Sequence, residues 1–243
     1  MIRMFRSEWM KIRRSVIWLL VAVSPLIAAL FGLFGLKKGG EDFPWIEALS
    51  LMSVLHAMFF LPLLTGVFAA LICRFEHAGG GWKAMLAAPV SRTQVYVVKF
   101  VIVMLMLAAT QLLLLIVLLL LGLSHGSAEG IPWRELASSF IGGWIACFPL
   151  AALQLFASVA FQSFAAPLAV NVVLTLPNIL VANSERFGPY DPWVQPMLAM
   201  IPRDDTYGYG AFNLPMETLF GVVAGSFVLF FVVGWTYFAR KAV

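Results

Sequence analysis

The residues with the most distinctive chemistry in this sequence lie in one polar segment, residues 74–92, between two long apolar stretches. The segment combines an acid, a histidine, a tryptophan and two cations: Glu76, His77, Trp82, Lys83 and Arg92. Three glycines precede Trp82, but a phosphate-binding loop requires Gly-x-x-x-x-Gly-Lys-Ser/Thr between a strand and a helix, and the sequence lacks that pattern. The segment is therefore not a P-loop, and its charges suit contact with a partner.

The histidines and cysteines do not indicate metal or redox chemistry. His56, His77 and His125 are scattered without the spacing of metal ligands, and Cys73 and Cys147 fall in apolar stretches. Buried free cysteines behave as small hydrophobic residues. We expect no metal site and no catalytic residue in this chain.

The composition identifies the environment of the chain. It is 62% hydrophobic and 12% charged, whereas soluble domains carry about 25% charged residues. Residues 136–184 contain no Asp, Glu, Lys or Arg. This uncharged segment is too long for one membrane crossing of about 20 residues and long enough for two. Proline and small polar residues at 161–167 supply the turn between them. The sequence predicts an all-α, polytopic membrane protein formed by a single transmembrane domain.

Six apolar segments are long enough to cross a bilayer. They are residues 16–36, 49–72, 95–121, 136–161, 164–183 and 218–238. Lys99 lies early in the third segment, and we expect its side chain to snorkel to the membrane interface.

The loops that alternate between these segments differ in charge. The side that holds the N-terminus carries two acids, Glu8 and Glu76, and most of the basic residues. These are Arg3, Arg6, Lys11, Arg13, Arg14, Arg74, Lys83, Arg92, Lys99, Arg240 and Lys241. The other side carries the remaining ten of the twelve acids. The positive-inside rule makes the basic side cytoplasmic, and with it both termini.

Residues 1–14 read as an amphipathic helix. Apolar residues recur at spacings of three and four along it: Ile2, Phe5, Trp9, Ile12 and Val16. Arg13 and Arg14 follow at the start of the first span. A basic helix with such a stripe lies in the membrane interface. The alternative is a plain basic tail that only sets the topology.

The segment 74–92 is expected to contain a short helix. Residues 82–87 can form one or two turns, which Pro89 stops. Ser91 and Gln94 have the spacing of a capping box that starts the third span. Such a helix would lie across the cytoplasmic ends of two spans and pass force from a partner to them, whereas the alternative is an ordinary loop. Three charged side chains of the segment are expected to face the cytosol: Glu76, Lys83 and Arg92.

From Glu76 to Lys99 the chain reads Glu-His-x-x-Gly-x-Trp-Lys-x-x-Leu-x-x-Pro-Val-Ser-Arg-x-x-x-Tyr-x-x-Lys, between spans two and three. This run resembles the cytoplasmic loop of ABC-2 type transporter permeases, and residues 7–14, leading into 24–26, resemble their opening. Within that group the chain looks most similar to the permease subunits of bacitracin-resistance and lantibiotic-immunity exporters. The glycine run at 79–81 departs from relatives that have a more helix-favouring stretch there.

The resemblance implies a half-transporter in the plasma membrane of a bacterium. An elbow helix (Phe5, Trp9, Arg13 and Arg14) would lie in the interface. A coupling helix in residues 74–92 would contact a separate ATPase subunit through Glu76, His77, Trp82, Lys83 and Arg92. Two ATPases, which bind ATP and Mg²⁺, would pair with two permeases, the second being the same chain or a paralogue. The chain itself would hold no cofactor and bind no nucleic acid, only membrane lipids and a peptide antibiotic or similar amphipathic, lipid-linked substrate.

The predicted spans contain no carboxylate and only one mid-membrane ionisable residue, His56. This argues against ion-coupled carriers and intramembrane proteases, which need titratable or metal-binding groups there. Five polar residues are candidates for a substrate path: Gln111, Gln154, Asn171, Thr175 and Asn178. The other interpretation is interhelical hydrogen bonding, worth about 0.6–2 kcal/mol each.

The largest loop on the outer side, residues 184–217, is rich in proline and aromatic residues, which suits an interface-lying or re-entrant structure. Its run Arg203-Asp204-Asp205 either pairs locally or meets a cationic peptide. One alternative to an exporter is a membrane sensor or scaffold that transports nothing. Such a protein would dock a cytoplasmic partner through the same 74–92 loop.

Overall fold

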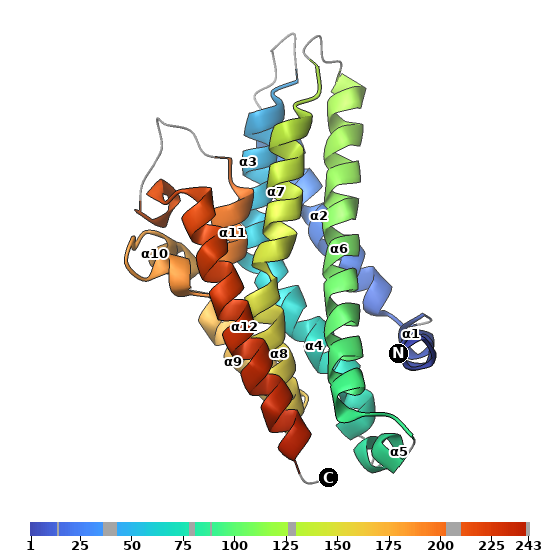
Figure 1. Ribbon diagram of the computed structural model, residues 1–243. Coiled ribbons are helices and arrows are strands. Elements are labelled where there is room, and N and C mark those ends of the chain that lie inside the picture. Colours follow the sequence, from blue (N-terminus) through green and yellow to red (C-terminus); the bar gives the residue numbers. More distant parts are fainter. Residues whose placement is uncertain are drawn as a thin grey trace.

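The computed structural model describes residues 1–13, 15–35, 43–77, 81–87, 89–125, 130–202 and 210–241. Every regular element among these residues is a helix (Figure 1). Five helical stretches are long and apolar enough to cross a membrane by length and composition: Ile17–Phe34, Trp45–His77, Arg92–His125, Trp133–Ala160 and Met216–Arg240. The chain is thus a multi-pass helical protein, as its hydropathy predicts.

The short N-terminal helix α1 (Ile2–Ile12) lies crosswise to the others and is seen end-on in Figure 1, where it packs against the long helix α6 (Arg92–His125). Helix α2 (Ile17–Gly35) follows and packs along α6. Helix α12 (Met216–Arg240) closes the other side against α8 (Phe148–Ala160).

The second span is continuous but not uniformly α-helical. Helix α3 (Trp45–Leu55) passes through a π-helical turn, η1 (His56–Phe60), into α4 (Leu61–His77). Pro62 lies just after the π-turn, where its missing N–H removes one helical hydrogen bond. A π-turn inserts one extra residue into the helix and re-aims the side chains around it. Here it places the backbone carbonyl of Met58 where another helix can bond it.

The fourth span bends once. Helix α7 (Trp133–Ala146) ends at Cys147, and α8 begins at Phe148 with Pro149 in its first turn. Proline is tolerated there because the first-turn N–H groups of a helix have no intrahelical acceptor.

The fifth predicted segment, residues 164–183, forms two short helices. Helix α9 (Ala165–Thr175) is apolar but short, and α10 (Asn178–Ala182) follows after a break at Leu176 and Pro177. Pro177 is the N-cap of α10, so its missing N–H coincides with the end of α9. Five helical stretches are long enough to cross a membrane. A sixth crossing would have to be formed by α9 and α10 together.

The loop after α10 turns back into the molecule. Between the 3-10 turns η3 (Gly188–Tyr190) and η4 (Gly210–Asn213), helix α11 (Gln195–Met200) packs against α7 with all of its residues buried. Gly143 of α7 allows this close approach, because a Cβ there would lie 2.1 Å from Cγ of Met200. The loop is therefore re-entrant with respect to the helix bundle, while its place relative to the membrane stays a prediction. Arg203, Asp204 and Asp205 lie outside the described residues.

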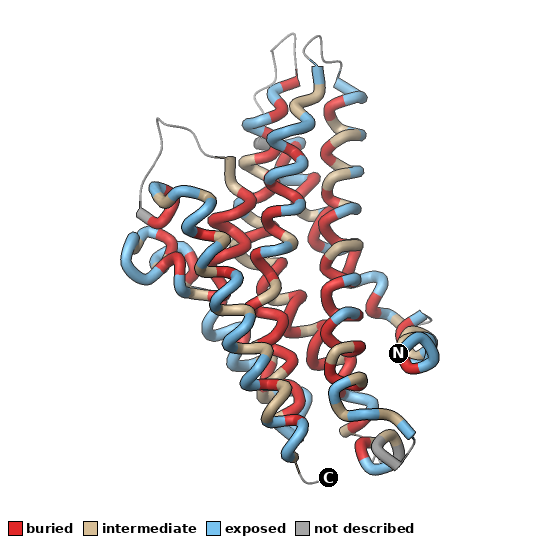
Figure 2. Tube along the Cα trace, viewed as in Figure 1, coloured by how far each residue is buried: buried red, intermediate tan, exposed pale blue. Residues whose placement is uncertain are grey.

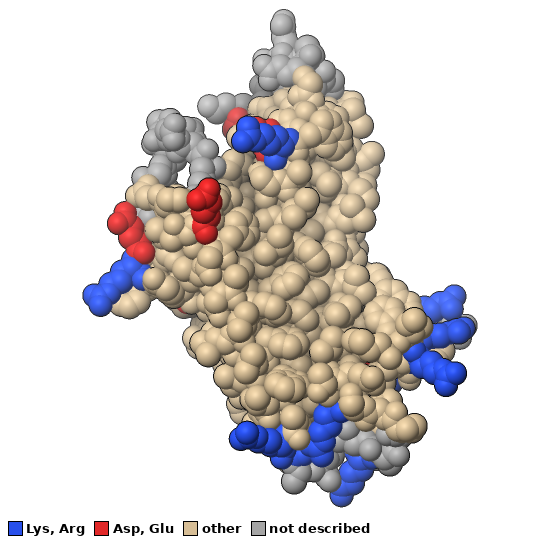
Figure 3. All heavy atoms as spheres, viewed as in Figure 1, with Lys and Arg blue, Asp and Glu red and all other residues tan. Residues whose placement is uncertain are grey.

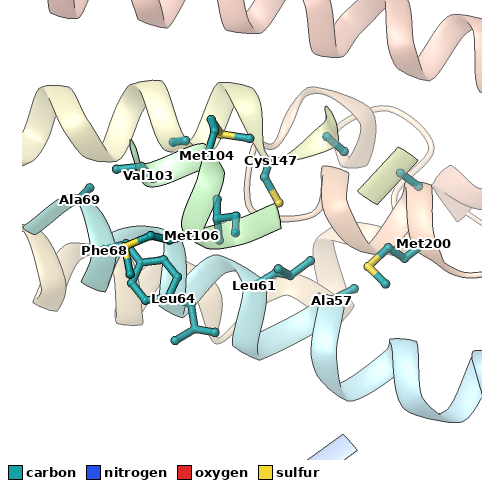
Figure 4. Packing of buried hydrophobic residues seen from close by; sticks show 14 of the residues in the cluster. Ala57, Leu61, Leu64, Phe68, Ala69, Val103, Met104, Met106, Cys147 and Met200 are labelled. Atoms are coloured by element: carbon teal, nitrogen blue, oxygen red, sulfur yellow. The ribbon is translucent and has the colours of Figure 1, made fainter. Parts of the chain in front are cut away.

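Apolar side chains fill the interior and also cover the outside of the bundle (Figure 2). Phe68 of α4, Met106 of α6 and the buried free cysteine Cys147, all labelled in Figure 4, belong to one hydrophobic core. On α12, by contrast, large residues such as Val228 and Leu229 are more than half exposed. An exposed apolar surface of this extent suits contact with lipid or with other membrane helices.

The charged residues lie at the two ends of this apolar band. Lys and Arg gather at the end that carries α1, the C-terminal end of α12 and α5 (Gly81–Ala87), and the acids visible in Figure 3 lie toward the opposite end. We call the first of these the basic end. The separation of charge predicted from the loops is thus reproduced in space.

Candidate functional site

Four charged side chains meet at the basic end, where α1 crosses α4 and α6. Nζ of Lys99 lies 3.0 Å from Oε2 of Glu8 and 2.8 Å from Oε2 of Glu76. Nζ of Lys11 contacts the same two carboxylates, at 2.5 Å from Glu8 and 2.7 Å from Glu76. Each carboxylate therefore bridges two ammonium groups, and we call this set the charge cluster.

The charge cluster is almost dry. The side chains of Lys99, Glu8 and Glu76 are 1%, 3% and 2% exposed, and only that of Lys11, at 30%, reaches solvent. Nζ of Lys99 donates two hydrogen bonds, to Oε2 of Glu8 and to the carbonyl of Ile72, each of 3.0 Å, and its contact with Oε2 of Glu76 is an ion pair without a hydrogen bond. Buried charges cost several kcal/mol each unless they are paired in this way.

Lys11 remains charged in this setting. Partial burial by itself lowers the pKa of its ammonium group, but hydrogen bonds and charge attraction from Glu76 and Glu8 outweigh that effect, and the pKa is raised above its usual value. The Lys11 ammonium group is thus held in its charged form by the two carboxylates that it contacts.

Two predictions about this region are wrong. Lys99 does not snorkel to the interface, and Glu76 does not face the cytosol, because α1 lies over both residues. Once α1 covers them, water is no longer their partner, and each must find an opposite charge inside the protein. The cluster could have been suspected from the sequence, since Glu8 and Glu76 are the only two acids on the basic side.

The short helix predicted at 82–87 is present as α5, beginning one residue earlier at Gly81. A Cβ at Gly81 would lie 2.8 Å from the carbonyl oxygen of Phe75, so only glycine lets α5 fold back this closely on the end of α4. Gly79 and Gly80 lie outside the described residues. The Ser91 half of the predicted capping box is confirmed: the backbone N–H of Gln94 donates to Oγ of Ser91 over 3.2 Å, and α6 begins at Arg92.

Trp82 anchors α5 to the bundle. Its side chain is buried, with its ring centroid 5.2 Å from that of Phe238 on α12 and 5.7 Å from that of His77 on α4. Nζ of Lys99 lies 5.6 Å from the Trp82 ring, which adds a cation–π contact and joins α5 to the charge cluster. One side chain thus links α5 to α4, α6 and α12.

Three basic side chains at this end cap the C-termini of other helices. Nε2 of His77 donates to the carbonyl of Ser158 (2.8 Å) and Nζ of Lys241 donates to that of Val159 (2.6 Å), both in the last turn of α8. Nη1 of Arg92 donates to the carbonyl of Phe238 (3.1 Å) in the last turn of α12. Cations at these positions satisfy free carbonyls and the negative end of the helix dipole.

These contacts change the interpretation of the predicted docking residues. Glu76 and Trp82 are buried, His77 and Arg92 are half-buried and bound to helix ends, and Lys83 alone of the five is exposed. Arg92 is only partly exposed, because its guanidinium also caps α12. Sequence reasoning missed Glu8, Lys11 and Lys99, whose role depends on a fold-level contact.

Helix α1 buries a different face from the one that its apolar stripe indicates. Met4, Glu8 and Ile12 face the protein, whereas Ile2 is 86% exposed. Phe5 and Trp9 are half-buried, with ring centroids 5.9 Å apart. Most of the stripe therefore remains available to lipid while the charged face packs inward. Arg13 is exposed, and Arg14 lies outside the described residues.

One cavity at this end lies between α1, the end of α4 and α5. It has a volume of about 520 Å³. Arg3 and Ser7 of α1 stand on one side, Phe75 and Met85 on the other, and the charge cluster lines it through Glu8, Lys11 and Glu76. The cluster thus has access to solvent from this side only through Lys11.

The five predicted path residues lie inside the helix packing. Their relative exposures are between 0% and 4%: Gln111, Gln154, Asn171, Thr175 and Asn178. Nε2 of Gln111 lies 3.1 Å from Sδ of Met200 on α11. His56, the ionisable residue of the second span, pairs through Nδ1 with Oγ of Ser24 on α2. Gln111, Gln154, Asn171 and Asn178 contact other helices or the loop after α10, as interhelical hydrogen bonding predicts, whereas Oγ1 of Thr175 donates to the carbonyl of Asn171 within α9.

Asn171 is the centre of the largest of these polar contacts. Its Oδ1 accepts from Nε2 of Gln154 (2.9 Å) and Nε1 of Trp193 (2.7 Å), and its Nδ2 donates to the carbonyl of Pro62 (2.9 Å). Gly66 makes room, since a Cβ there would lie 2.3 Å from Nδ2 of Asn171. Asn178 adds bonds from its Nδ2 to the carbonyls of Met58 in the π-turn and of Trp193. Helices α4, α8, α9 and the re-entrant loop are therefore tied together at one point.

We expect Asn171→Leu to destabilise the protein by about 2 kcal/mol, because three hydrogen bonds are lost at about 0.6 kcal/mol each and buried partners are left unpaired. Thermal unfolding in detergent, followed by tryptophan fluorescence, measures the change. Asn183→Leu, at an exposed asparagine of the same segment, is the matched control. Equal effects of the two substitutions would contradict the role of Asn171.

The sequence was compared with known families and proteins. A family model described as "ABC-2 family transporter protein" matches residues 4–178, which include α1, the charge cluster, α5 and Asn171. A search of curated proteins gives no match to this chain. Because the match covers well over half of the chain and includes the elements of the basic end, the chain belongs to the ABC-2 family of transporter proteins.

Proposed function

We propose that this chain is the membrane-spanning permease subunit of an ATP-driven exporter, with the basic end in the cytoplasm. Family membership supports a transporter permease, and the gathering of Lys and Arg at one end supports the orientation. Both termini would then be cytoplasmic, α1 would be the interfacial elbow helix, and α9–α10 would complete a sixth crossing. The membrane would be the plasma membrane of a bacterium.

The observation that carries the proposal is the attachment of α5. This helix sits across the basic end and is bound through Trp82 to α4, α6 and α12 at once. A push on α5 therefore reaches three long helices through packed side chains rather than through a flexible loop. This is what a permease needs if its energy comes from nucleotide hydrolysis in another chain.

The partner in this proposal is a separate ATPase subunit, present in two copies, which holds ATP and Mg²⁺. This chain supplies no nucleotide site and acts with a second permease, either another copy or a paralogue. Lys83 is the residue of α5 best placed for the contact, because it is exposed next to the buried anchor Trp82. Glu76, His77 and Arg92 would act by holding the docking element in position.

We further propose a peptide antibiotic or a similar amphipathic, lipid-linked molecule as the substrate. The support is the likeness of the chain, within the ABC-2 permeases that residues 76–99 resemble, to the permease subunits of bacitracin-resistance and lantibiotic-immunity exporters. A drug-sensitivity panel on a strain that lacks the gene tests the substrate class. Unchanged sensitivity to all membrane-active peptides would reject it.

Co-purification with a candidate ATPase subunit, co-expressed from the same organism, tests the docking. Lys83→Glu is expected to reduce the recovered ATPase at least tenfold, since a like or unpaired charge replaces the exposed cation of α5. Arg240→Glu, an exposed cation at the same end on α12, is the control and should change recovery less than twofold. If the wild-type chain recovers a partner without nucleotide hydrolysis, the protein is a sensor or scaffold instead of an exporter subunit.

A further inference from the structure

A second, smaller cavity at the basic end lies outside α5 and the charge cluster. It has a volume of about 220 Å³ and separates the end of α4 from the turn between α8 and α9. Its lining is polar on both sides: Arg74 and His77 from α4, Ser158 from α8, and Gln162 and Ser163 from the turn. None of the described residues around it is acidic.

The positive charge of this cavity comes from Arg74. The guanidinium of Arg74 lies 5.4 Å from the ring centroid of Phe164, the N-cap of α9, and makes no ion pair among the described residues. The ring fixes the guanidinium beside the turn, where it is exposed. A cation that is held in place without a carboxylate partner favours the binding of an anionic ligand.

The backbone adds to this field. Helix α9 is eleven residues long and begins at the cavity, so the positive end of its dipole lies at the same place as Arg74. Its first-turn N–H groups add little, because Pro167 has none and that of Ala165 is already bonded. Oγ of Ser163 accepts from the N–H of Ala165, which keeps the turn closed around the start of α9.

An independent sign of a ligand is the hydroxyl of Ser158. Ser158 is 2% exposed and lines the cavity, and its Oγ has no hydrogen-bond partner among the described residues. His77 does not satisfy it, because Nε2 of His77 donates to the carbonyl of Ser158 instead. A buried hydroxyl without a partner is costly, and a ligand oxygen in the cavity would accept its hydrogen.

We propose that this cavity binds the phosphate of a phospholipid headgroup, with Arg74 as its cation and Ser158 as its buried donor. A phosphate offers several acceptor oxygens, which matches a guanidinium and hydroxyl groups better than a single-acceptor ligand does. The cavity is below the roughly 300 Å³ of drug-sized sites, so it holds a headgroup and not the acyl chains.

The neighbouring surface identifies lipid as the source of the phosphate. Pro167 of α9 lines the cavity, and the exposed apolar residues Val170 and Val173 follow it along the same helix at 44% and 64% exposure. Acyl chains leaving the cavity would lie along this face. A free phosphate would make no use of it.

Native mass spectrometry of the detergent-solubilised chain with added dioleoyl phosphatidylglycerol tests the proposal. The wild type is expected to retain one such lipid, and Arg74→Gln and Ser158→Ala to weaken its binding by about tenfold and about threefold, as expected for loss of a charge-assisted and a neutral hydrogen bond. Arg240→Gln removes an exposed cation at the same end and should change binding less than twofold. Dioleoylglycerol, which has the same chains without the phosphate, should not be retained.

Several outcomes would overturn this site. Equal retention of dioleoylglycerol would mean that the chains alone bind, and equal weakening by Arg240→Gln would mean non-specific charge attraction. Displacement of the lipid by the same concentration of inorganic phosphate would assign the cavity to free phosphate. If Arg74→Gln does not give a monodisperse protein, the small substitution Ser158→Ala decides, and unchanged binding in that variant rejects the proposal.

Discussion

Replacing Lys99 with methionine is expected to lower the free energy of unfolding by about 3–5 kcal/mol, the usual cost of removing one partner from a buried ion pair. Methionine retains the length of the side chain and fills the same space, so the loss comes from charge and not from a cavity. Glu8 and Glu76 would then share a single cation, Lys11, which is partly in water. The two carboxylates lie close enough to repel each other once Lys99 is absent.

The same substitution should loosen α1, because Glu8 is its buried charged contact with α6. Thermal unfolding in detergent measures the stability, and limited trypsin digestion at Arg3 and Arg6 measures the release of α1. Lys83→Met, at an exposed lysine, is the control and should change stability by less than about 0.5 kcal/mol. A Lys99→Met protein as stable as the control would show that the carboxylates find another partner.

A second substitution separates pairing from burial. Glu8→Gln combined with Lys99→Met removes one charge of each sign and leaves Lys11 paired with Glu76. We expect the double variant to recover part of the stability lost in Lys99→Met, since buried ion pairs are frequently worth little against neutral residues of similar size. Additive losses in the two single variants would contradict the cluster as a unit.

Features that depend on neighbouring residues in the chain were predictable. Hydropathy predicts the apolar segments. Local sequence signals predict the short helix after the glycine run, its end before Pro89 and the Ser91 cap. The charge asymmetry of the two ends follows from the loops in the same way.

Features that depend on where helices meet were not predictable. Glu8 and Lys99 are far apart in the sequence, and only the crossing of α1 over α6 brings them within 3.0 Å. A pattern of apolar residues placed the stripe of α1 correctly but could not show that a charged face packs inward. The polar residues of α9 were recognised as a stripe, yet whether a stripe lines a path or binds a neighbouring helix depends on Gly66, whose missing side chain admits Asn171.

The break of the predicted fifth span shows a further limit of hydropathy. Residues 164–183 are apolar enough for one crossing, but Pro177 ends α9 and re-aims the chain, and Asn178 then bonds the π-turn of the second span. Hydropathy measures whether a segment tolerates lipid, and it does not measure whether its backbone continues as one helix.

Replacing Trp82 with alanine is expected to detach α5 while the spans stay folded. Truncation of a buried aromatic residue costs about 3–5 kcal/mol, and here the loss falls on the contacts of a seven-residue helix with His77, Phe238 and Lys99. A helix this short has little stability of its own, so it depends on its anchor. If α5 docks the ATPase, as we propose, recovery of the ATPase with the permease should fall at least tenfold.

The control is Trp133→Ala, at an exposed tryptophan that begins α7 toward the opposite end. It should leave ATPase recovery within twofold of the wild type, whereas both variants should reach the membrane in normal amounts. Loss of the Trp82→Ala protein from the membrane would mean that Trp82 holds the spans together. Unchanged ATPase recovery would mean that docking does not use α5.

Trp82→Phe distinguishes the packing of the ring from its polar edge. Phenylalanine retains the contact with Phe238 and a weaker cation–π contact with Lys99, but it loses the indole N–H that lies 3.4 Å from Nδ1 of His77. The N–H bond is long and contributes little, so we expect Trp82→Phe to restore most of the ATPase recovery that Trp82→Ala loses. Because the Trp82 ring contacts Lys99, the stability losses of Trp82→Ala and Lys99→Met should not add in the double variant. This energetic coupling between Trp82 and Lys99 is what would transmit a push on α5 through the charge cluster to the elbow helix.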